Sequence, residues 1–332
     1  MKGDRSILVT GGAGFIGSHL VERLLGRGHR VIVVDDLSTG HESNLEAARV
    51  MGGDRLTFIR STVSAMSNRS DVGPCDAIHH LAAAVGVRRV MDRPMESLET
   101  NVVETAAAIR MALQWDAALL LASSSEVYGK STKLPFHEAD DVVYGSTAIT
   151  RWSYGCSKAL DEYMGLAAYR AHGLRVVVAR LFNTVGPRQV GRWGMVLPRF
   201  IEAALAGQPL QVHGDGMQSR CFADVRDVAV VLDQLLETPQ AAGGVFNVGS
   251  DRSISIQQLA ELVLRCTGSH STITHVPYES VFGSGFEDLH ARQPDLRRMR
   301  EVTGFATTIS LEQTIRDVMA SMGACVSKES AA

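Results

Sequence analysis

The stretch Ile7-Leu8-Val9-Thr10-Gly11-Gly12-Ala13-Gly14-Phe15-Ile16-Gly17 decides the fold of this chain. A short apolar strand runs directly into glycines spaced three apart, and residues 18–25 continue as a helical segment. Gly11 permits the tight turn, Gly14 lets the backbone approach a pyrophosphate, and Gly17 lets the helix pack closely on the strand. The free N–H groups at the start of the helix would face the phosphates. The stretch therefore predicts the first unit of a dinucleotide-binding sheet.

A second apolar strand, residues 31–34, ends at Asp35, and Asp36 follows it. Asp35 lies 24 residues beyond Gly11, close to the spacing of about 20 expected for the acid that hydrogen-bonds the adenosine ribose of a dinucleotide. Because a carboxylate here repels a 2′-phosphate, the sequence favours NAD over NADP as the cofactor. The expected order of a dinucleotide-binding unit is present: strand, glycines, helix, second strand and acid. A glycine turn that binds no ligand is therefore the less favoured interpretation of this stretch.

Tyr154 and Lys158 are spaced so that a helix would place both side chains on one face. An ammonium group beside a phenol stabilises the phenolate and lowers its pKa from about 10. Ser124 lies upstream and can hydrogen-bond and orient the same substrate oxygen. The three residues predict a site that removes a proton from an alcohol while a hydride leaves its carbon. Taken alone, the spacing favours an interpretation without catalysis, in which the tyrosine is buried and the lysine is solvated. Together with the glycine stretch, the catalytic interpretation is the stronger one.

Short apolar segments alternate with helical segments along much of the chain. Parallel strands covered by helices on both faces produce this alternation, so we expect an α/β fold with a Rossmann-type doubly wound parallel sheet. After residue 183, prolines and glycines divide the chain into short pieces, which indicates a smaller α/β lobe over the carboxyl edge of the sheet. The expected further strands are residues 56–59, 77–81, 118–122, 176–181 and 245–248, and the expected long helices are residues 97–113 and 154–169.

The composition of the chain excludes several classes of protein. Its 332 residues are 45% hydrophobic and 21% charged, which suits a globular protein with a large core. A net charge of −3 gives no basis for nucleic-acid binding. The five cysteines show no metal-binding spacing, so we expect free thiols, no metal and a reducing compartment. The first strand leaves no room for a signal peptide and no apolar run could span a bilayer, so a cytoplasmic protein is expected.

At these residues the chain resembles the extended short-chain dehydrogenase/reductase family of NAD-dependent nucleotide-sugar epimerases, dehydratases and decarboxylases. The resemblance covers nearly the whole chain and implies that the two lobes are interleaved. It implies an NAD-binding domain at residues 1–182 and 223–250, a nucleotide-sugar-binding lobe at 183–222 and 251–325, and a flexible tail at 326–332. The matching runs are residues 80–83, 101–102, 180–187, 214–220, 225–228 and 246–249.

The resemblance also assigns residues to the cofactor and to a UDP-sugar substrate. Asn183 and Arg220 match positions that bind the diphosphate, and an arginine fork suits phosphate oxygens, although a single arginine is more often a solvated surface charge. The cofactor candidates are Gly11, Gly14, Phe15, Ile16, Gly17, Asp35, Asp36, Ser38, Thr39, Gly40, Thr62, Leu81, Ala82, Ala83, Tyr154 and Lys158. The substrate candidates are Val87, Arg88, Asn183, Val196, Gln211, His213, Arg220 and Arg292.

Glu126 bears on the choice of reaction. Family dehydratases carry Thr-Asp-Glu where this chain has Ser124-Ser125-Glu126, and Ser125 cannot be the strong acid that dehydration needs. UDP-glucuronate decarboxylases carry Ser/Thr-Ser/Cys-Glu there, and the runs Arg151-Trp152-Ser153-Tyr154 and Asp288-Leu289-His290-Ala291-Arg292-Gln293-Pro294 also resemble theirs. The resemblance thus implies decarboxylation of UDP-glucuronate after oxidation at C4. The implied catalytic residues are Ser124, Ser125, Glu126, Tyr154, Lys158 and Arg292.

Other functions stay open at this point. Ser61-Thr62 replaces the family's Gly-Asp, whose Asp touches adenine, and Val85-Gly86-Val87-Arg88 resembles epimerases. UDP-glucuronate 4-epimerase and UDP-glucose 4-epimerase are the enzymatic alternatives, an NAD-sensing scaffold is the non-enzymatic one, and Glu126 as a purely structural acid is the alternative for that residue. Because the family pairs two long helices of each subunit in a four-helix bundle, a homodimer through residues 97–113 and 154–169 is expected.

Overall fold

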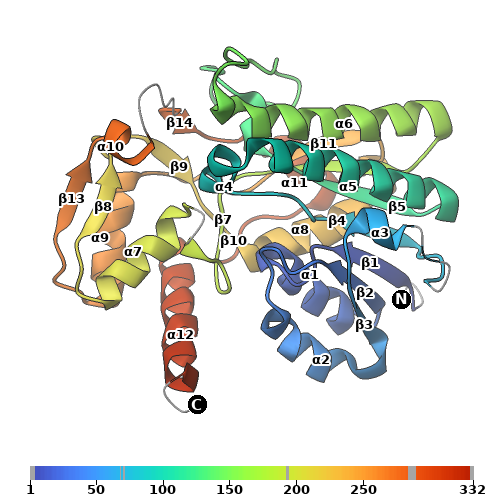
Figure 1. Cartoon of the computed structure of the whole chain (residues 1–332), viewed down its shortest axis with the longest axis horizontal. Helices are drawn as coiled ribbons and strands as arrows, with labels where there is room; N and C mark the ends of the chain where they lie inside the picture. Colours follow the sequence, from blue (N-terminus) through green and yellow to red (C-terminus); the bar gives the residue numbers. More distant parts are fainter. Residues whose placement is uncertain (1–3, 68, 70–71, 192–193, 283–288, 330–332) are drawn as a thin grey trace.

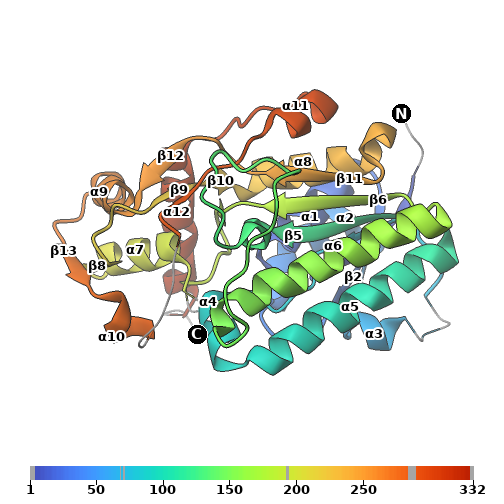
Figure 2. The ribbon, with the colours of Figure 1, turned by 90° about the horizontal axis from the view of Figure 1, so that it is seen from above.

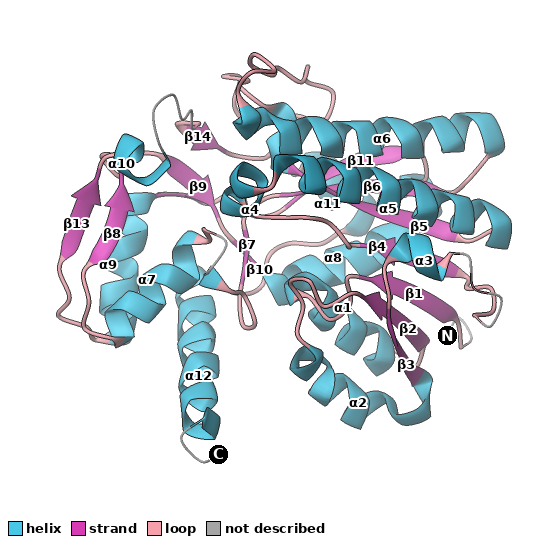
Figure 3. Ribbon diagram, in the orientation of Figure 1, coloured by secondary structure: helices cyan, strands magenta, loops and turns pink. Residues whose placement is uncertain are grey.

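A seven-stranded sheet of parallel strands forms the centre of the molecule (Figure 1, Figure 3). The computed structural model describes residues 4–67, 69, 72–191, 194–282 and 289–329. The strand order is β11-β6-β5-β4-β1-β2-β3, so the chain winds outward in both directions from the boundary between β1 and β4. This confirms the doubly wound sheet predicted from the sequence. The strands are β1 (Ser6–Thr10), β2 (Arg30–Asp35), β3 (Leu56–Arg60), β4 (Ala77–His80), β5 (Ala118–Ser124), β6 (Val176–Leu181) and β11 (Gly244–Val248).

Helices cover both faces of this sheet, which explains why its strands are apolar along their whole length. In β1, Ile7 and Val9 pack on the side of helix α1, whereas Leu8 packs on the side of helix α5. Figure 2 shows α5 and α6 running side by side along their face. One face carries α1 (Phe15–Gly26), α2 (Glu46–Gly52) and α8 (Val225–Glu237), and the other carries α3 (Val63–Met66), α5 (Pro94–Trp115) and α6 (Ser153–His172).

The smaller lobe lies beyond the carboxyl edge of the sheet, at the left of Figure 1. Its core is a separate apolar cluster that includes Phe200, Val212, Leu259 and Ile315. Its helices are α7 (Val196–Leu205), α9 (Ile256–Thr267), α10 (Tyr278–Phe282) and α12 (Leu311–Glu329). Its strands are β8 (Leu210–His213) with β13 (Ile273–Val276), and β9 (Ser219–Cys221) between β12 (Ser253–Ser255) and β14 (Ala291–Arg292). Helix α4 (Val87–Asp92) precedes α5.

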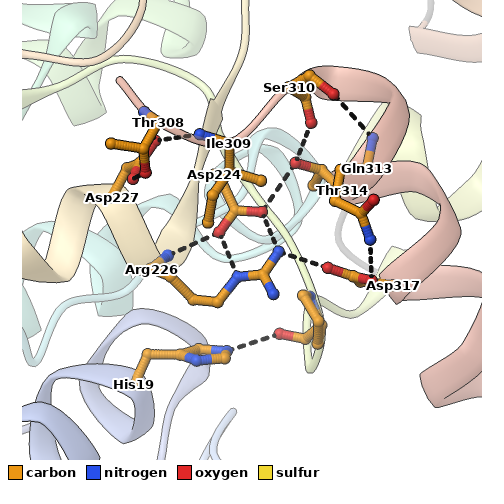
Figure 4. A network of polar contacts seen from close by, with 11 residues as sticks. His19, Asp224, Arg226, Asp227, Thr308, Ile309, Ser310, Gln313, Thr314 and Asp317 are labelled. Atoms are coloured by element: carbon orange, nitrogen blue, oxygen red, sulfur yellow. Dashed lines mark hydrogen bonds and ion pairs between the residues drawn. The ribbon is translucent and has the colours of Figure 1, made fainter. Parts of the chain in front are cut away.

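A polar network fixes the last helix of the small lobe to the first turn of α8 (Figure 4). Strand β10 (Ala223–Asp224) pairs with β7 (Thr184–Val185), and Asp224 then caps α8 by accepting the backbone N–H of Arg226. The Arg226 guanidinium bridges Asp224 to Asp317 of α12, and the Thr314 hydroxyl also donates to Asp224. This network ties the small lobe to the sheet domain at a point next to the ligand-binding edge.

Two stretches of the chain lie differently from the expected division. Helix α11 (Arg297–Thr303) was expected in the small lobe, but Leu296 and Met299 pack with Phe246 against β11 and α8 of the sheet domain. Residues 326–329, expected at the start of a flexible tail, continue the last helix. Helix α12 runs to Glu329, and residues 330–332 lie outside the described residues. No helix in the described part of the chain has the length and apolar composition needed to cross a bilayer.

Candidate active site

A cavity of about 590 Å³ opens at the carboxyl edge of the central sheet and extends under the small lobe. The turn after β1 contributes Gly11 and the end of β2 contributes Asp35, while Ser124 comes from the end of β5. From the small lobe, Gln211 and Arg220 complete the wall. Ligands of doubly wound sheets bind at this edge, near the point where the strand order reverses. The cavity is therefore the candidate active site.

The glycine turn has the geometry that a dinucleotide needs. Gly11 has a φ of +68°, a conformation that L side chains rarely adopt. A Cβ at Gly17 would lie 2.1 Å from the Gly11 carbonyl oxygen, so no side chain fits between the turn and α1. A Cβ at Gly14 would meet only that same oxygen, at 3.1 Å, and Gly14 lines the cavity. The backbone at Gly14 is thus open to a ligand.

Asp35 stabilises this turn through hydrogen bonds to the backbone. Its carboxylate accepts the backbone N–H of Ala13 at 3.0 Å and that of Leu37 at 2.8 Å. Burial raises the pKa of Asp35, and these backbone donors act in the opposite direction. Gly40, another cofactor candidate, packs against Ala13 and does not line the cavity. The cofactor candidates that do line this end are Phe15, Ile16, Asp36, Ser38, Thr39, Thr62, Leu81, Ala82 and Ala83.

The residues present therefore fit a dinucleotide, because an open glycine cradle, a helix start and a buried acid line one cavity. The Thr62 hydroxyl is already engaged, since it accepts the backbone N–H of Ala65 at 3.2 Å and caps α3. Across the described residues, no group of histidine, cysteine or acidic side chains is arranged to hold a metal ion.

Tyr154 and Ser124 meet at the centre of the cavity. Ser124 ends β5 and caps the following 3₁₀ turn, Ser125–Tyr128, by accepting the backbone N–H of Glu126. Tyr154 lies in the first turn of α6, and its phenol is hydrogen-bonded to the Ser124 side chain. A Cβ at Gly155 would lie 2.4 Å from the Glu126 carbonyl oxygen. A glycine at this position therefore lets α6 approach the 3₁₀ turn closely enough to bring phenol and hydroxyl together.

Lys158 does not act on Tyr154 as expected from the sequence. Its ammonium group is buried and donates to the Asp161 carboxylate at 2.7 Å, and Lys158 does not line the cavity. Burial and the negative charge of Glu126 raise the pKa of Tyr154, with the Ser124 hydrogen bond acting in the opposite direction. The expected lowering of that pKa by Lys158 is therefore wrong for this structure, because the nearby Asp161 takes the ammonium group. The alternative of a solvated lysine is also wrong.

Glu126 lies between two arginines. Arg151 donates to both of its carboxylate oxygens, at 2.7 and 3.1 Å, and Arg292 donates to one of them. Burial by itself raises the pKa of Glu126, but the charges of Arg292 and Arg151 outweigh it and hold the pKa far below that of a free glutamate. All three residues line the cavity, as does the buried Ser125. In this arrangement Glu126 is a carboxylate and cannot donate a proton.

The small lobe supplies the polar groups at the other end of the cavity. Arg220 of β9 is paired in register with Arg292 of β14, and both are largely buried. Asn183, Val196, Gln211 and His213 also line this end. Of the remaining substrate candidates, Val87 and Arg88 begin α4, and their side chains lie outside the described part of the structure. Asp288 of the Asp288–Pro294 run is likewise not among the described residues.

Sequence reasoning missed several residues of the cavity wall. The Gln218 amide donates to the His213 carbonyl and to the Tyr278 hydroxyl, and the Tyr278 ring meets the His213 ring edge to face. Glu104 of α5 also lines the cavity. Arg151 belongs to the run 151–154 that resembles family decarboxylases, but the resemblance implies no role for it. Gln218 lies in the run 214–220 that resembles the family, but the resemblance implies no role for it. Glu104 is a single polar residue in an ordinary helical segment, so the sequence holds no indication of it.

The chain is similar to known proteins over most of its length. The model of the NAD dependent epimerase/dehydratase family matches residues 7–249. The UDP-N-acetyl-alpha-D-glucosaminuronate decarboxylase of Bacillus cytotoxicus is 40% identical over 94% of this chain and 96% of its own. UDP-glucuronic acid decarboxylase 1 of Arabidopsis thaliana is 33% identical over 92% of this chain and 67% of its own. The solved Thermus thermophilus UDP-glucose 4-epimerase, a complex with NAD, is 26% identical with a TM-score of 0.83, covering 96% of this chain and 99% of that one.

Proposed function

Because the chain belongs to the NAD dependent epimerase/dehydratase family, we propose that it is an NAD-dependent decarboxylase of UDP-glucuronate or a close UDP-uronate. The observation that carries the proposal is the buried carboxylate of Glu126 held between Arg151 and Arg292, beside the hydrogen-bonded Ser124 and Tyr154. Both decarboxylase relatives support it, and their names share a UDP-linked uronate as substrate. The product would be UDP-xylose or its 4-keto form when the substrate is UDP-glucuronate.

Bound NAD would supply a hydride acceptor for C4 of the sugar and, once reduced, a hydride donor. The pyrophosphate would lie on the backbone at Gly14 and the start of α1, and Asp35 would accept the adenosine ribose hydroxyls. A carboxylate at Asp35 would also repel a 2′-phosphate. Leu81, Ala82 and Ala83 would form the apolar wall of the cofactor site.

Tyr154 is the proposed base for the C4 hydroxyl, with Ser124 orienting that oxygen. The two side chains already share a hydrogen bond, so one substrate oxygen can reach both. In the structure the pKa of Tyr154 lies above its usual range. The proposal therefore requires this pKa to fall when ligands bring positive charge to the site, because a cation nearby favours the phenolate. Lys158 could contribute by turning from Asp161.

Decarboxylation follows from the position of the oxidised carbon. A ketone at C4 is β to the C6 carboxylate, so the electrons of the C5–C6 bond can flow into the ketone as an enolate while CO₂ leaves. The enolate oxygen then needs hydrogen-bond donors, which Tyr154 and Ser124 can supply. Two guanidinium groups against one carboxylate give the Glu126 cluster a net positive charge, which favours binding of the anionic sugar. Glu126 would thus orient the Arg292 guanidinium towards the substrate carboxylate and would not donate a proton.

The nucleotide half of the substrate would occupy the small lobe. Arg220 and Asn183 would bind the diphosphate, because a buried guanidinium fork matches phosphate oxygens. Gln211 and His213 would border the uridine, with Val196 at the start of α7 nearby. Val87 and Arg88 stay proposed neighbours of the sugar. The substituent at C2 is open, because one relative is named for the 2-acetamido sugar and another for glucuronate.

Product masses test the reaction directly. The protein is incubated with NAD and, in separate reactions, UDP-glucuronate, UDP-N-acetylglucosaminuronate and UDP-glucose, and each product is identified by mass spectrometry. Loss of CO₂ from a uronate supports the decarboxylase. A product of unchanged mass identified as UDP-galacturonate or UDP-galactose would overturn it in favour of the 4-epimerase, the activity named for the Thermus thermophilus structure. No change in any sugar and no NADH absorbance would favour a scaffold.

Variants at the cluster separate sugar chemistry from cofactor binding. Glu126→Gln and Arg292→Lys should lower uronate turnover at least about tenfold, because each breaks a charged hydrogen bond to the cluster. NAD affinity should stay within about twofold in both, because Glu126 and Arg292 lie away from the glycine turn. Normal turnover in both variants would leave Glu126 as a structural acid.

We also propose that two copies of the chain associate through α5 and α6. The two helices lie side by side on an outer face (Figure 2) and expose apolar side chains there, with Tyr163 65% and Leu160 44% exposed. Val103 of α5 is 48% exposed. Apolar side chains gathered on one face of a helix pair favour burial against another helix pair.

A further inference from the structure

Glu104 is an acidic side chain in the wall of the cofactor end of the cavity. It lies on α5 and is only 8% exposed. Its two carboxylate oxygens accept the backbone N–H of Ser64 at 2.9 Å and the Ser64 hydroxyl at 2.7 Å. These contacts join α5 to α3, which lies beside it (Figure 2). Neither the glycine motif nor the chemistry at C4 requires an acid here.

The path of a bound dinucleotide brings its adenine to this corner. The pyrophosphate would lie at the start of α1 and the adenosine ribose at the end of β2. The next strand outward is β3, so the adenine must continue towards the residues that follow it. Ser61, Thr62 and Val63 follow β3 and line the cavity, and Glu104 lines the same cavity from α5. Glu104 contacts Ser64, two residues beyond Thr62.

The chemistry of this corner favours Glu104 as the acceptor for adenine. The 6-amino group of adenine donates two hydrogen bonds and needs an acceptor. The Thr62 hydroxyl already accepts the Ala65 N–H, and one Asp36 oxygen accepts the Ser38 N–H. A carboxylate has about four acceptor positions, and Ser64 uses one on each Glu104 oxygen. Glu104 therefore has capacity left while its orientation is fixed.

We propose that Glu104 recognises the adenine of NAD by accepting a hydrogen bond from the 6-amino group, and that Ser64 positions its carboxylate for this contact. The acceptor thus comes from α5, because the hydroxyl of Thr62 after β3 is already engaged at the start of α3. The inference concerns the cofactor alone and does not depend on the reaction at the sugar. The simpler role for Glu104 is to cap α3 through Ser64, and the test must separate the two roles.

The test compares NAD with nicotinamide hypoxanthine dinucleotide, which carries a carbonyl in place of the 6-amino group. The hypoxanthine dinucleotide competes against NAD for the purified protein, and the bound nucleotides are quantified after rapid filtration. The native protein should prefer NAD by about tenfold, because hypoxanthine places an acceptor against the carboxylate. In Glu104→Gln the amide N–H can donate to the carbonyl, so this preference should fall by about tenfold or reverse.

Two control variants make the result decisive. Ser64→Ala removes the positioning hydroxyl but keeps the carboxylate, so it should weaken both dinucleotides while retaining most of the preference for NAD. Glu99→Gln changes an exposed acid of the same helix and should alter neither affinity. If Glu104→Gln leaves the ratio of the two affinities unchanged, whether or not both affinities fall, Glu104 only caps α3 and the proposal is overturned.

Discussion

Arg151 donates from both terminal nitrogens to the carboxylate of Glu126, at 2.7 and 3.1 Å, with both side chains largely withdrawn from water. Glu126 follows the strand end that carries Ser124, and Arg151 precedes the helix start that carries Tyr154. The pair therefore joins the two segments that present the hydroxyl and the phenol. A forked contact of this kind fixes orientation as well as distance.

Arg151→Lys should lower uronate turnover while leaving cofactor binding intact. Lysine keeps the charge but cannot donate from two fixed nitrogens, so Glu126 and Arg292 would lose their alignment. We expect kcat to fall about 10- to 100-fold, roughly 1.4–2.8 kcal/mol, with the Kd for NAD within about twofold. Steady-state kinetics and equilibrium binding measure the two quantities. Arg93→Lys, at an exposed ion pair with Glu96, is the matched control and should change neither. Unaltered kcat in Arg151→Lys would show that the fork is not needed.

Tyr154→Phe should abolish oxidation at C4 without unfolding the protein. Only the phenol oxygen is removed, and a positioned base contributes about 10²–10⁴ in rate. Mixing enzyme, NAD and uronate and following NADH absorbance in a single turnover measures the step. Ser124→Ala, which removes the partner of the phenol, should slow the same step less. Appearance of NADH at the native rate in Tyr154→Phe would exclude the phenol as the base.

Lys158→Met should destabilise the fold as well as the site. Asp161 would lose the ammonium partner of a pair whose side chains are 3% and 2% exposed, and breaking a buried pair costs about 3–5 kcal/mol. Denaturant unfolding measures this loss, and NAD affinity should fall too if Lys158 reaches the nicotinamide ribose. The double variant Lys158→Met with Asp161→Asn removes the unpaired charge and should recover more than half of the stability. Equal stability of the single and double variants would contradict the buried pair.

His19 should make folding stability depend on pH in mildly acidic solution. Burial lowers its pKa to about 4, and its Nε2 contacts the Pro187 carbonyl oxygen at 3.1 Å (Figure 4). The unfolded chain takes up this proton near pH 6.5, so stability is complete above that pH and is lost as the pH falls towards 4. His19→Gln should reduce the slope of unfolding free energy against pH by up to about 1.4 kcal/mol per pH unit. The unfolding free energy of both proteins is measured by urea unfolding between pH 4.5 and 7. The same slope against pH in the variant and the native protein would refute the role of His19.

Tyr163→Glu should weaken association of two copies. A charge at an apolar contact between helix pairs must be buried without a partner, so the dissociation constant should rise at least about tenfold. Light scattering at micromolar concentration measures the mass of both proteins. Val50→Glu, at a 90% exposed position on α2, is the control and should leave the dimer unchanged. A monomeric native protein at that concentration would rule out the proposed dimer.

The parts of the fold that the sequence predicts are those determined by local sequence patterns. The glycine turn, the strand ending at Asp35 and the apolar strands around residues 118–124 follow from spacing and composition over a few residues. The closeness of Ser124 and Tyr154 depends on how the start of α6 packs against the turn after β5, and local pattern does not show it. The pairing of Glu126 with Arg151 and Arg292 joins distant parts of the chain, and only the folded arrangement reveals it.

Some contacts could not be predicted because the sequence permits two different arrangements of the same residues. Lys158 and Asp161 are three residues apart on one helix, so the sequence permitted their pairing. It equally permitted Lys158 to turn towards Tyr154, and only the burial of Asp161 decides between them. The division implied by the family resemblance puts Leu296 and Met299 in the small lobe, but they complete the apolar surface beside β11.

The chain crosses from one lobe to the other repeatedly between β6 and α12, and this restricts how the protein can be recombined. The small lobe is assembled from α7 to β9, from β12 to β14 and from α12, while α8, β11 and α11 return to the sheet domain. A chimera that imports the nucleotide-sugar preference of a relative cannot be made with a single crossover. It needs three exchanged segments, and the third must bring a residue equivalent to Asp317 that still meets Arg226.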